Sequence, residues 1–151
     1  MKVYLVQHGI PKPEEEDPQR PLSDRGVEEV KRMAEHLARA GIRVARVYHS
    51  GKLRARETAE ILAERLDVER LEEAQGLKPL DDPALWAERL GNTSSDTMLV
   101  GHLPHLQKLS SLLLAGDPEK RIISFRQGGV VCMEKDSEGW AIKWIVNPEI
   151  I

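Results

Sequence analysis

The sequence predicts an α/β fold in which helices cover a largely parallel sheet. Short apolar and β-branched runs alternate with segments whose apolar residues recur at helical spacing, which is typical of parallel sheets. The last two such runs flank a turn at residues 136–139, which predicts an antiparallel hairpin late in the chain. The length of 151 residues suits one domain, and we expect residues 1–151 to form it.

The expected strands cover residues 2–6, 44–49, 97–100, 130–134 and 140–146. The expected helices cover residues 23–40, 52–66, 82–90 and 103–115. Ser23 suits the N-cap of the first helix, and Gly41 suits its C-terminal end. The Asp-Asp-Pro sequence at residues 81–83 is a start signal for the third helix.

Residues 10–21, called here the Pro-rich segment, differ in composition from the rest of the chain. They contain four prolines and the acidic run Glu14–Asp17, which makes a helix or a central strand unfavourable. The segment is therefore expected to be a loop, either simply solvated or serving as a flap beside a site.

Composition and charge exclude several classes of protein. There are 22 Lys and Arg residues against 25 Asp and Glu, so the net charge is −3, which disfavours a broad nucleic-acid interface. The single cysteine, Cys132, cannot form an internal disulfide. Residues 1–7 are too short an apolar stretch for a signal peptide or membrane span. We expect a cytoplasmic protein without a nucleic-acid or membrane partner.

Two predicted strands each end in a histidine beside a glycine. His8 follows the first strand, and His102 follows the strand at residues 97–100. Ligands in open α/β sheets bind beyond the carboxyl ends of the strands, so the two imidazoles are expected to share one edge. The helix after Ser50 offers free N–H groups to an anion, and it carries Arg54 in its first turn. A cation there opposes the helix dipole, as happens at functional positions.

Two imidazoles, a guanidinium and a helix N-terminus suit a dianionic phosphate. One imidazole can attack phosphorus while the other groups stabilise the phosphoryl oxygens. His102 and His105 have a spacing found in zinc sites, but Pro104 lies between them and no Cys or acidic ligand follows at ligand spacing. We therefore expect no metal or cofactor. The alternative is that the histidines are structural and Arg54 is a solvated helix charge.

Four motifs in this order resemble the histidine phosphatase superfamily, whose fold is also called phosphoglycerate mutase-like. They are the strand and x-His-Gly at residues 3–9, Pro-Leu-Ser-Asp-Arg-Gly at 21–26, Ser-x-x-x-Arg-Ala-x-x-Thr at 50–58, and Val-Gly-His-Leu-Pro at 100–104. The resemblance covers residue 2 to about residue 114, and the compact length resembles the SixA-type phosphohistidine phosphatases. It implies a three-layer α/β/α architecture.

The resemblance also implies a phosphatase that forms a covalent phosphohistidine on His8 and needs no metal. Arg54 and His102 would hold the phosphoryl oxygens, and water would hydrolyse the intermediate to inorganic phosphate. The implied substrate is phosphohistidine on a partner protein, such as a phosphotransfer domain or phosphocarrier of a signalling or sugar-transport relay. The implied phosphate-binding residues are Gln7, Gly9, Arg54, His102 and Leu103, with Arg20 and Ser50 at the rim.

The clearest departure from the family is Gln7, because the family usually reads Arg-His-Gly at this point. Gln donates a hydrogen bond but supplies neither charge nor a guanidinium fork. Removal of one oxyanion-type donor costs about 10²–10³ in kcat, and loss of its charge alone should cost less. We expect activity to survive with weaker phosphate affinity. Arg20, at the end of the Pro-rich segment, is a candidate for the missing cation.

Larger members of the family carry a Glu that protonates an alcohol leaving group. The only acidic residues in the corresponding segment, residues 76–82, are Asp81 and Asp82, which also suit the start of the next helix. The lack of a Glu favours phosphohistidine, whose imidazole leaves more easily than an alkoxide. Two alternatives stay open: a weakly catalytic or non-catalytic module that binds phosphate or a phosphoprotein, and a small-molecule phosphomonoesterase.

Overall fold

The computed structural model describes residues 1–151 and contains one six-stranded sheet. The strand order is β3-β2-β4-β1-β5-β6. Strands β1 to β4 run parallel, and β5 and β6 add an antiparallel hairpin at one edge. This confirms the predicted α/β class with a mostly parallel sheet. The strands are β1 (Lys2–Gln7), β2 (Arg46–His49), β3 (Arg70–Glu73), β4 (Thr97–Gly101), β5 (Val130–Asp136) and β6 (Gly139–Val146).

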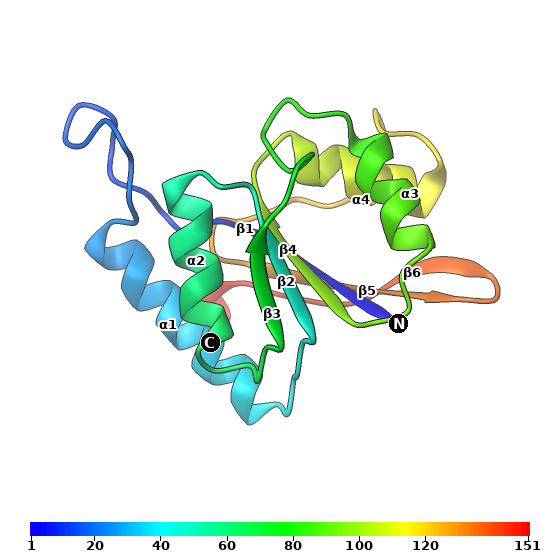
Figure 1. Ribbon diagram of the computed structural model, residues 1–151, viewed down its shortest axis with the longest axis horizontal. Coiled ribbons are helices and arrows are strands. Elements are labelled where there is room, and N and C mark those ends of the chain that lie inside the picture. Colours follow the sequence, from blue (N-terminus) through cyan, green and yellow to red (C-terminus); the bar gives the residue numbers. More distant parts are fainter.

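Helices cover both faces of the sheet, as the three-layer expectation requires (Figure 1). Side chains alternate along β1, so Tyr4 and Val6 pack with α1 and α2 while Val3 and Leu5 pack with α3 and α4. A short 3-10 helix follows β6 at the C-terminal end. The helices are α1 (Asp24–Arg39), α2 (Leu53–Ala63), α3 (Pro83–Gly91), α4 (His105–Ala115) and η1 (Pro148–Ile150).

Helix α1 follows its sequence signals closely. The Ser23 side chain accepts a hydrogen bond from the N–H of Gly26, which confirms it as the N-cap. Val30, Met33 and Leu37 lie on the buried side of the helix. Gly41 lies just beyond the helix with φ +78°, a left-handed conformation that glycine adopts easily.

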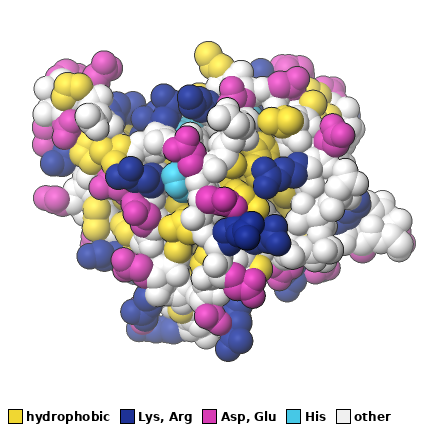
Figure 2. Space-filling model, viewed as in Figure 1, with side chains coloured by type: hydrophobic (Ala, Val, Ile, Leu, Met, Phe, Trp, Pro, Cys, Tyr) yellow, Lys and Arg dark blue, Asp and Glu magenta, His cyan; other side chains and the backbone are white.

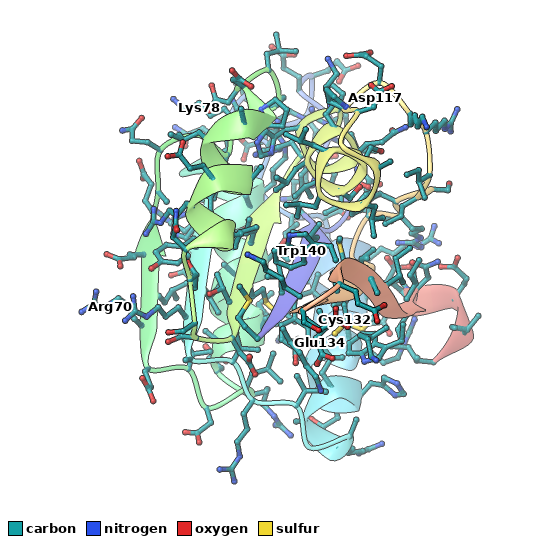
Figure 3. The ribbon with its side chains drawn as sticks, turned by 90° about the vertical axis from the view of Figure 1, so that its right-hand side faces the viewer. Arg70, Lys78, Asp117, Cys132, Glu134 and Trp140 are labelled. Atoms are coloured by element: carbon teal, nitrogen blue, oxygen red, sulfur yellow. The ribbon has the colours of Figure 1, made fainter.

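Strand β3 and several element boundaries differ from the sequence prediction. All four residues of β3, Arg70–Glu73, are exposed, so this edge strand shows no apolar pattern, and Arg70 points away from the sheet (Figure 3). Strand β2 begins at Arg46 and α2 ends at Ala63, where the chain tightens into turns. Helix α4 begins at His105 because residues 103–104 form a turn with Pro104 at the N-cap.

The Pro-rich segment forms a loop closed by its own backbone hydrogen bonds. A single bridge joins Pro11 to Leu22, and the N–H of Lys12 donates to the carbonyl of Pro21 over 2.7 Å. The loop projects beyond the helices on one side of the molecule (Figure 1), with Glu14–Glu16 exposed. The structure confirms the predicted absence of a helix or central strand here.

Cys132 is buried on β5, as a small apolar residue would be, and its thiol forms no disulfide (Figure 3). Burial raises the pKa of this thiol to about 11. None of the helices is long and apolar enough to cross a membrane.

Candidate functional site

The candidate site lies where the neighbouring parallel strands β1 and β4 end. Gln7 pairs with Gly101 in the register of the two strands, so the residues that follow, His8 and His102, emerge side by side. Their ring centroids are 5.0 Å apart with an interplanar angle of 53°. The N–H of His8 also donates to the carbonyl of Gly101 over 3.1 Å. The structure thus brings together two histidines that are 94 positions apart in the sequence.

His8 is held in one tautomer by the backbone carbonyl of the next residue, Gly9. Its Nδ1 lies 2.8 Å from the carbonyl oxygen of Gly9, and because a carbonyl only accepts, Nδ1 carries the proton. The lone pair is therefore on Nε2. Burial, with the charges of Arg54 and Arg20, lowers the pKa of His8 to about 4. His8 is neutral at pH 7 and can act as a nucleophile through Nε2.

His102 is buried and contacts Ser50. The distance between Ser50 Oγ and His102 Nε2 is 2.6 Å, and Ser50 Oγ also accepts the N–H of Lys52 over 3.3 Å. Burial is the main cause that lowers the pKa of His102 to about 3, helped by His8, Arg54 and Lys52. Ser50 is only 2% exposed, so it lies beneath the site and not at its rim.

Arg54 in the first turn of α2 is linked to the end of β1 through Thr58. The Thr58 hydroxyl donates to the carbonyl of Arg54 over 2.7 Å and accepts the N–H of Gly9 over 3.0 Å. The Gly9 N–H therefore already has a partner inside the chain. A Cβ at Gly9 would come within 2.8 Å of Val30, so close packing against α1 requires a glycine here. The Nε of Arg54 is buried without a partner.

A cleft of about 340 Å³ adjoins the site between the Pro-rich segment and the start of α2. Its lining includes Gln19, Lys52, Arg54 and Arg56. Burial and the nearby charge of Arg20 lower the pKa of Arg54. Lys52 is not among the predicted site residues, although its position two residues before Arg54 could have suggested it.

The segment before β5, which contacts the end of β1 at Gln7, is a second feature that the sequence did not indicate. The N–H of Gly128 donates to the carbonyl oxygens of Gln7 and His8 over 2.9 and 3.2 Å. Two residues earlier, Arg126 binds the buried carboxylate of Glu29 through both terminal nitrogens, at 2.9 and 3.1 Å. The segment before β5 thereby fixes the end of β1. The side-chain Oε1 of Gln7 is buried and has no partner.

The other polar groups near the site differ in whether they already have a hydrogen-bond partner within the chain. The N–H of Leu103 makes no hydrogen bond within the chain, which leaves it available to a ligand. Asp82 caps α3 by accepting the N–H of Ala84, and Asp81 accepts the N–H of Lys78, so both carboxylates have local structural roles. His105 is fully buried, and neither of its ring nitrogens has a partner. No group of three or more His, Cys, Asp or Glu residues is placed to hold a metal ion.

The sequence is similar to a known protein family and to a protein of Picosynechococcus sp.. A family model, the histidine phosphatase superfamily (branch 1), matches residues 3–81. An uncharacterised protein of Picosynechococcus sp. is 30% identical over 138 residues, which cover 87% of this chain and 83% of that protein.

Among solved structures, the protein histidine phosphatase SixA complexed with tungstate matches with a TM-score of 0.86 and 25% identity over 99% of both chains. The putative phosphohistidine phosphatase SixA of Agrobacterium tumefaciens has a TM-score of 0.78 and 20% identity over 97% of both chains. A putative alpha-ribazole-5'-P phosphatase of Escherichia coli K-12 has a TM-score of 0.77 and 15% identity over 98% of both. The chain therefore belongs to the histidine phosphatase superfamily and is of the SixA type.

Proposed function

We propose that this phosphatase removes phosphate from phosphohistidine on a partner protein, through a covalent intermediate on His8. The observation that carries the proposal is the state of His8. Its Nδ1–H is fixed on the carbonyl of Gly9, its Nε2 is unprotonated, and its ring lies beside His102. Similarity to the two SixA structures supports a phosphohistidine substrate.

In the first step, the lone pair of His8 Nε2 attacks phosphorus, and the bond between phosphorus and the partner's imidazole breaks. The leaving ring departs neutral when its other nitrogen carries a proton. His8 then carries phosphorus on Nε2 and hydrogen on Nδ1, so the modified ring is a cation. The carbonyl of Gly9, 2.8 Å from Nδ1, stabilises that positive charge.

In the second step, water attacks phosphorus and the bond to His8 Nε2 breaks. The electron pair returns to Nε2, His8 leaves as a neutral imidazole, and both protons of the water leave with the phosphate as H2PO4⁻, which then equilibrates with solvent. Arg54, His102 and the N–H of Leu103 stabilise the phosphoryl oxygens during both steps. Neither step requires a carboxylic acid, which agrees with the structural roles of Asp81 and Asp82.

The experiment is a single-turnover assay without added metal. A phosphotransfer domain labelled on its histidine is mixed with wild type, His8→Ala or His36→Ala, and release of inorganic phosphate is followed with an alkaline quench that preserves phosphohistidine. His36 is an exposed histidine on α1 and serves as the matched control. We expect turnover by wild type and His36→Ala, and none by His8→Ala.

Other outcomes would assign a different function. Label that stays on His8 without release would favour a binding or phosphate-accepting module, in keeping with the uncharged Gln7. Faster turnover of a small phosphomonoester than of the phosphorylated domain would favour a small-molecule phosphatase. Turnover that survives His8→Ala would overturn the mechanism.

A further inference from the structure

Three cations stand at the site without acidic partners. The molecule has ten ion pairs, and none of them includes Arg20, Lys52 or Arg54. Arg56, one turn further along the same cleft, does pair with Glu60 at 3.6 Å. Like charges that are gathered without a counter-charge favour an anionic ligand.

Lys52 is held next to the catalytic histidines by its backbone. Its N–H donates to Ser50 Oγ, and the same oxygen lies 2.6 Å from His102 Nε2. Lys52 also lines the cleft together with Arg54. One serine hydroxyl therefore sets the position of both the lysine and the second imidazole.

Arg20 is held by the Pro-rich segment. Its backbone is in the left-handed region with φ +49°, and its Nε donates to the carbonyl of Lys12 over 3.2 Å. The N–H of Leu22 donates to Glu57 over 2.8 Å, which ties the end of the loop to α2. Gln19, the residue before Arg20, lines the same cleft as Lys52. A left-handed arginine is unusual, and such conformations cluster at functional sites.

The charges of Arg20 and Lys52 act on the groups of the site, which places both side chains near it. The charge of Arg20 lowers the pKa of both His8 and Arg54, and that of Lys52 lowers the pKa of His102. Lys and Arg side chains gather beside the projecting loop at the upper left of the view, next to visible histidine surface (Figure 2). A phosphoryl dianion bound there would relieve the mutual repulsion of the cations.

We propose that Arg20 and Lys52 bind the phosphoryl group directly and supply the positive charge that Gln7 lacks. This inference rests on the proposed function, because it places the same phosphoryl group between His8 and His102. It adds Lys52 to the binding residues. It also makes the Pro-rich segment, through Arg20, a part of the site and not a solvated connection.

The test measures the Kd of inorganic phosphate at pH 8 by isothermal titration calorimetry, and so does not depend on turnover. Arg20→Gln and Lys52→Gln should each weaken binding about five- to tenfold, the lower range for a charge-assisted hydrogen bond that is partly exposed. Arg56→Gln, a paired cation in the same cleft, should change Kd less than twofold. Arg20→Lys, which keeps the charge, should stay within threefold of wild type.

A second set of binding measurements uses the substitution Gln7→Arg. In the wild type the added guanidinium meets Arg20 and Lys52, so its gain in affinity should be small. In the Arg20→Gln, Lys52→Gln double variant the same change should strengthen binding at least threefold more than in the wild type. If Gln7→Arg strengthens phosphate binding equally in the wild type and in the double variant, the charges act independently. Arg20 and Lys52 then do not compensate for the missing charge at position 7.

Two further results would overturn the inference: no binding of millimolar phosphate by the wild type, or equal Kd values for Arg56→Gln and the two site variants. Thermal unfolding of each variant by circular dichroism confirms that it is folded. If phosphate binding depends on Arg20 and Lys52 while phosphohistidine is not hydrolysed, the proposed substrate is wrong and the binding residues stand.

Discussion

Acidification should destabilise the folded chain through His8. The fold lowers the pKa of His8 from its ordinary value of 6.5 to about 4, mainly by burial. Between these two values the unfolded chain binds a proton that the folded chain does not, so the free energy of unfolding falls as the pH falls. The stabilising contribution of neutral His8 to the free energy of unfolding is fully present above pH 6.5 and is lost by pH 4. At pH 5 the loss from this one residue is about 2 kcal/mol.

The assay is urea unfolding at pH 7.5 and pH 5.0, followed by tryptophan fluorescence, to which the buried Trp86 contributes. For each protein the two free energies of unfolding are subtracted, which removes any effect of a substitution that does not depend on pH. Wild type should lose about 2 kcal/mol more between the two pH values than His8→Gln. His102, with a pKa near 3, contributes to the loss in both proteins.

His36→Gln is the control, because His36 is an exposed histidine on α1. It should show the same loss as wild type. A loss of stability in His8→Gln as large as that of wild type between pH 7.5 and 5.0 would contradict this prediction. The pKa of His8 would then be the same in the folded and the unfolded chain, and neither burial nor the charges of Arg54 and Arg20 would be what keeps its ring neutral.

Three substitutions test how the site is held in place. Thr58→Val leaves the buried N–H of Gly9 unpaired and should cost about 1–3 kcal/mol in urea unfolding; a loss under 0.5 kcal/mol would show that the hydroxyl link is unimportant. Gly26→Ala would drive a methyl group into the backbone of Ile10 and should lower the free energy of unfolding by about 1–3 kcal/mol or more. Arg126→Gln removes the two-point partner of the buried Glu29 and leaves it only the exposed Arg25, so it should destabilise by about 3 kcal/mol or less, with partial recovery when Glu29→Gln is added. The absence of that recovery would contradict the ion-pair argument.

The strands that carry the histidines were predictable because they are buried on both faces. Residues 3–6 and 97–100 are continuous apolar or β-branched runs in the sequence and fully buried in the fold. The ends of such strands place His8 and His102 at one edge without further information. Strand β3 was not predictable in this way, because its four residues are exposed and its place in the sheet depends on pairing with β2.

The surroundings of the histidines depend on contacts between residues far apart in the sequence. Gly9 meets Thr58 across 49 positions, and Ser50 meets His102 across 52. No local pattern indicates that a serine hydroxyl will reach a particular imidazole nitrogen. For this reason the sequence placed Ser50 at the rim while the fold buries it. The motif identified the residue, but only tertiary packing defines its contact.

The free site combines neutral imidazoles with unpaired cations, and the two features support each other. The charges of Arg54 and Arg20 help to lower the pKa of His8, and those of Arg54 and Lys52 the pKa of His102, which keeps the proposed nucleophile, His8, unprotonated at pH 7. The same charges attract a dianion. In the proposed complex we expect the charge of the phosphoryl group to offset the cations and to favour protonation of His102, whose ring can then donate a hydrogen bond to a phosphoryl oxygen. At pH 8, where inorganic phosphate is already mainly a dianion, its binding should therefore take up a proton, and calorimetry in buffers of different ionisation enthalpy measures that uptake. No proton uptake would mean that His102 stays neutral in the complex and that the cations hold the phosphoryl charge alone.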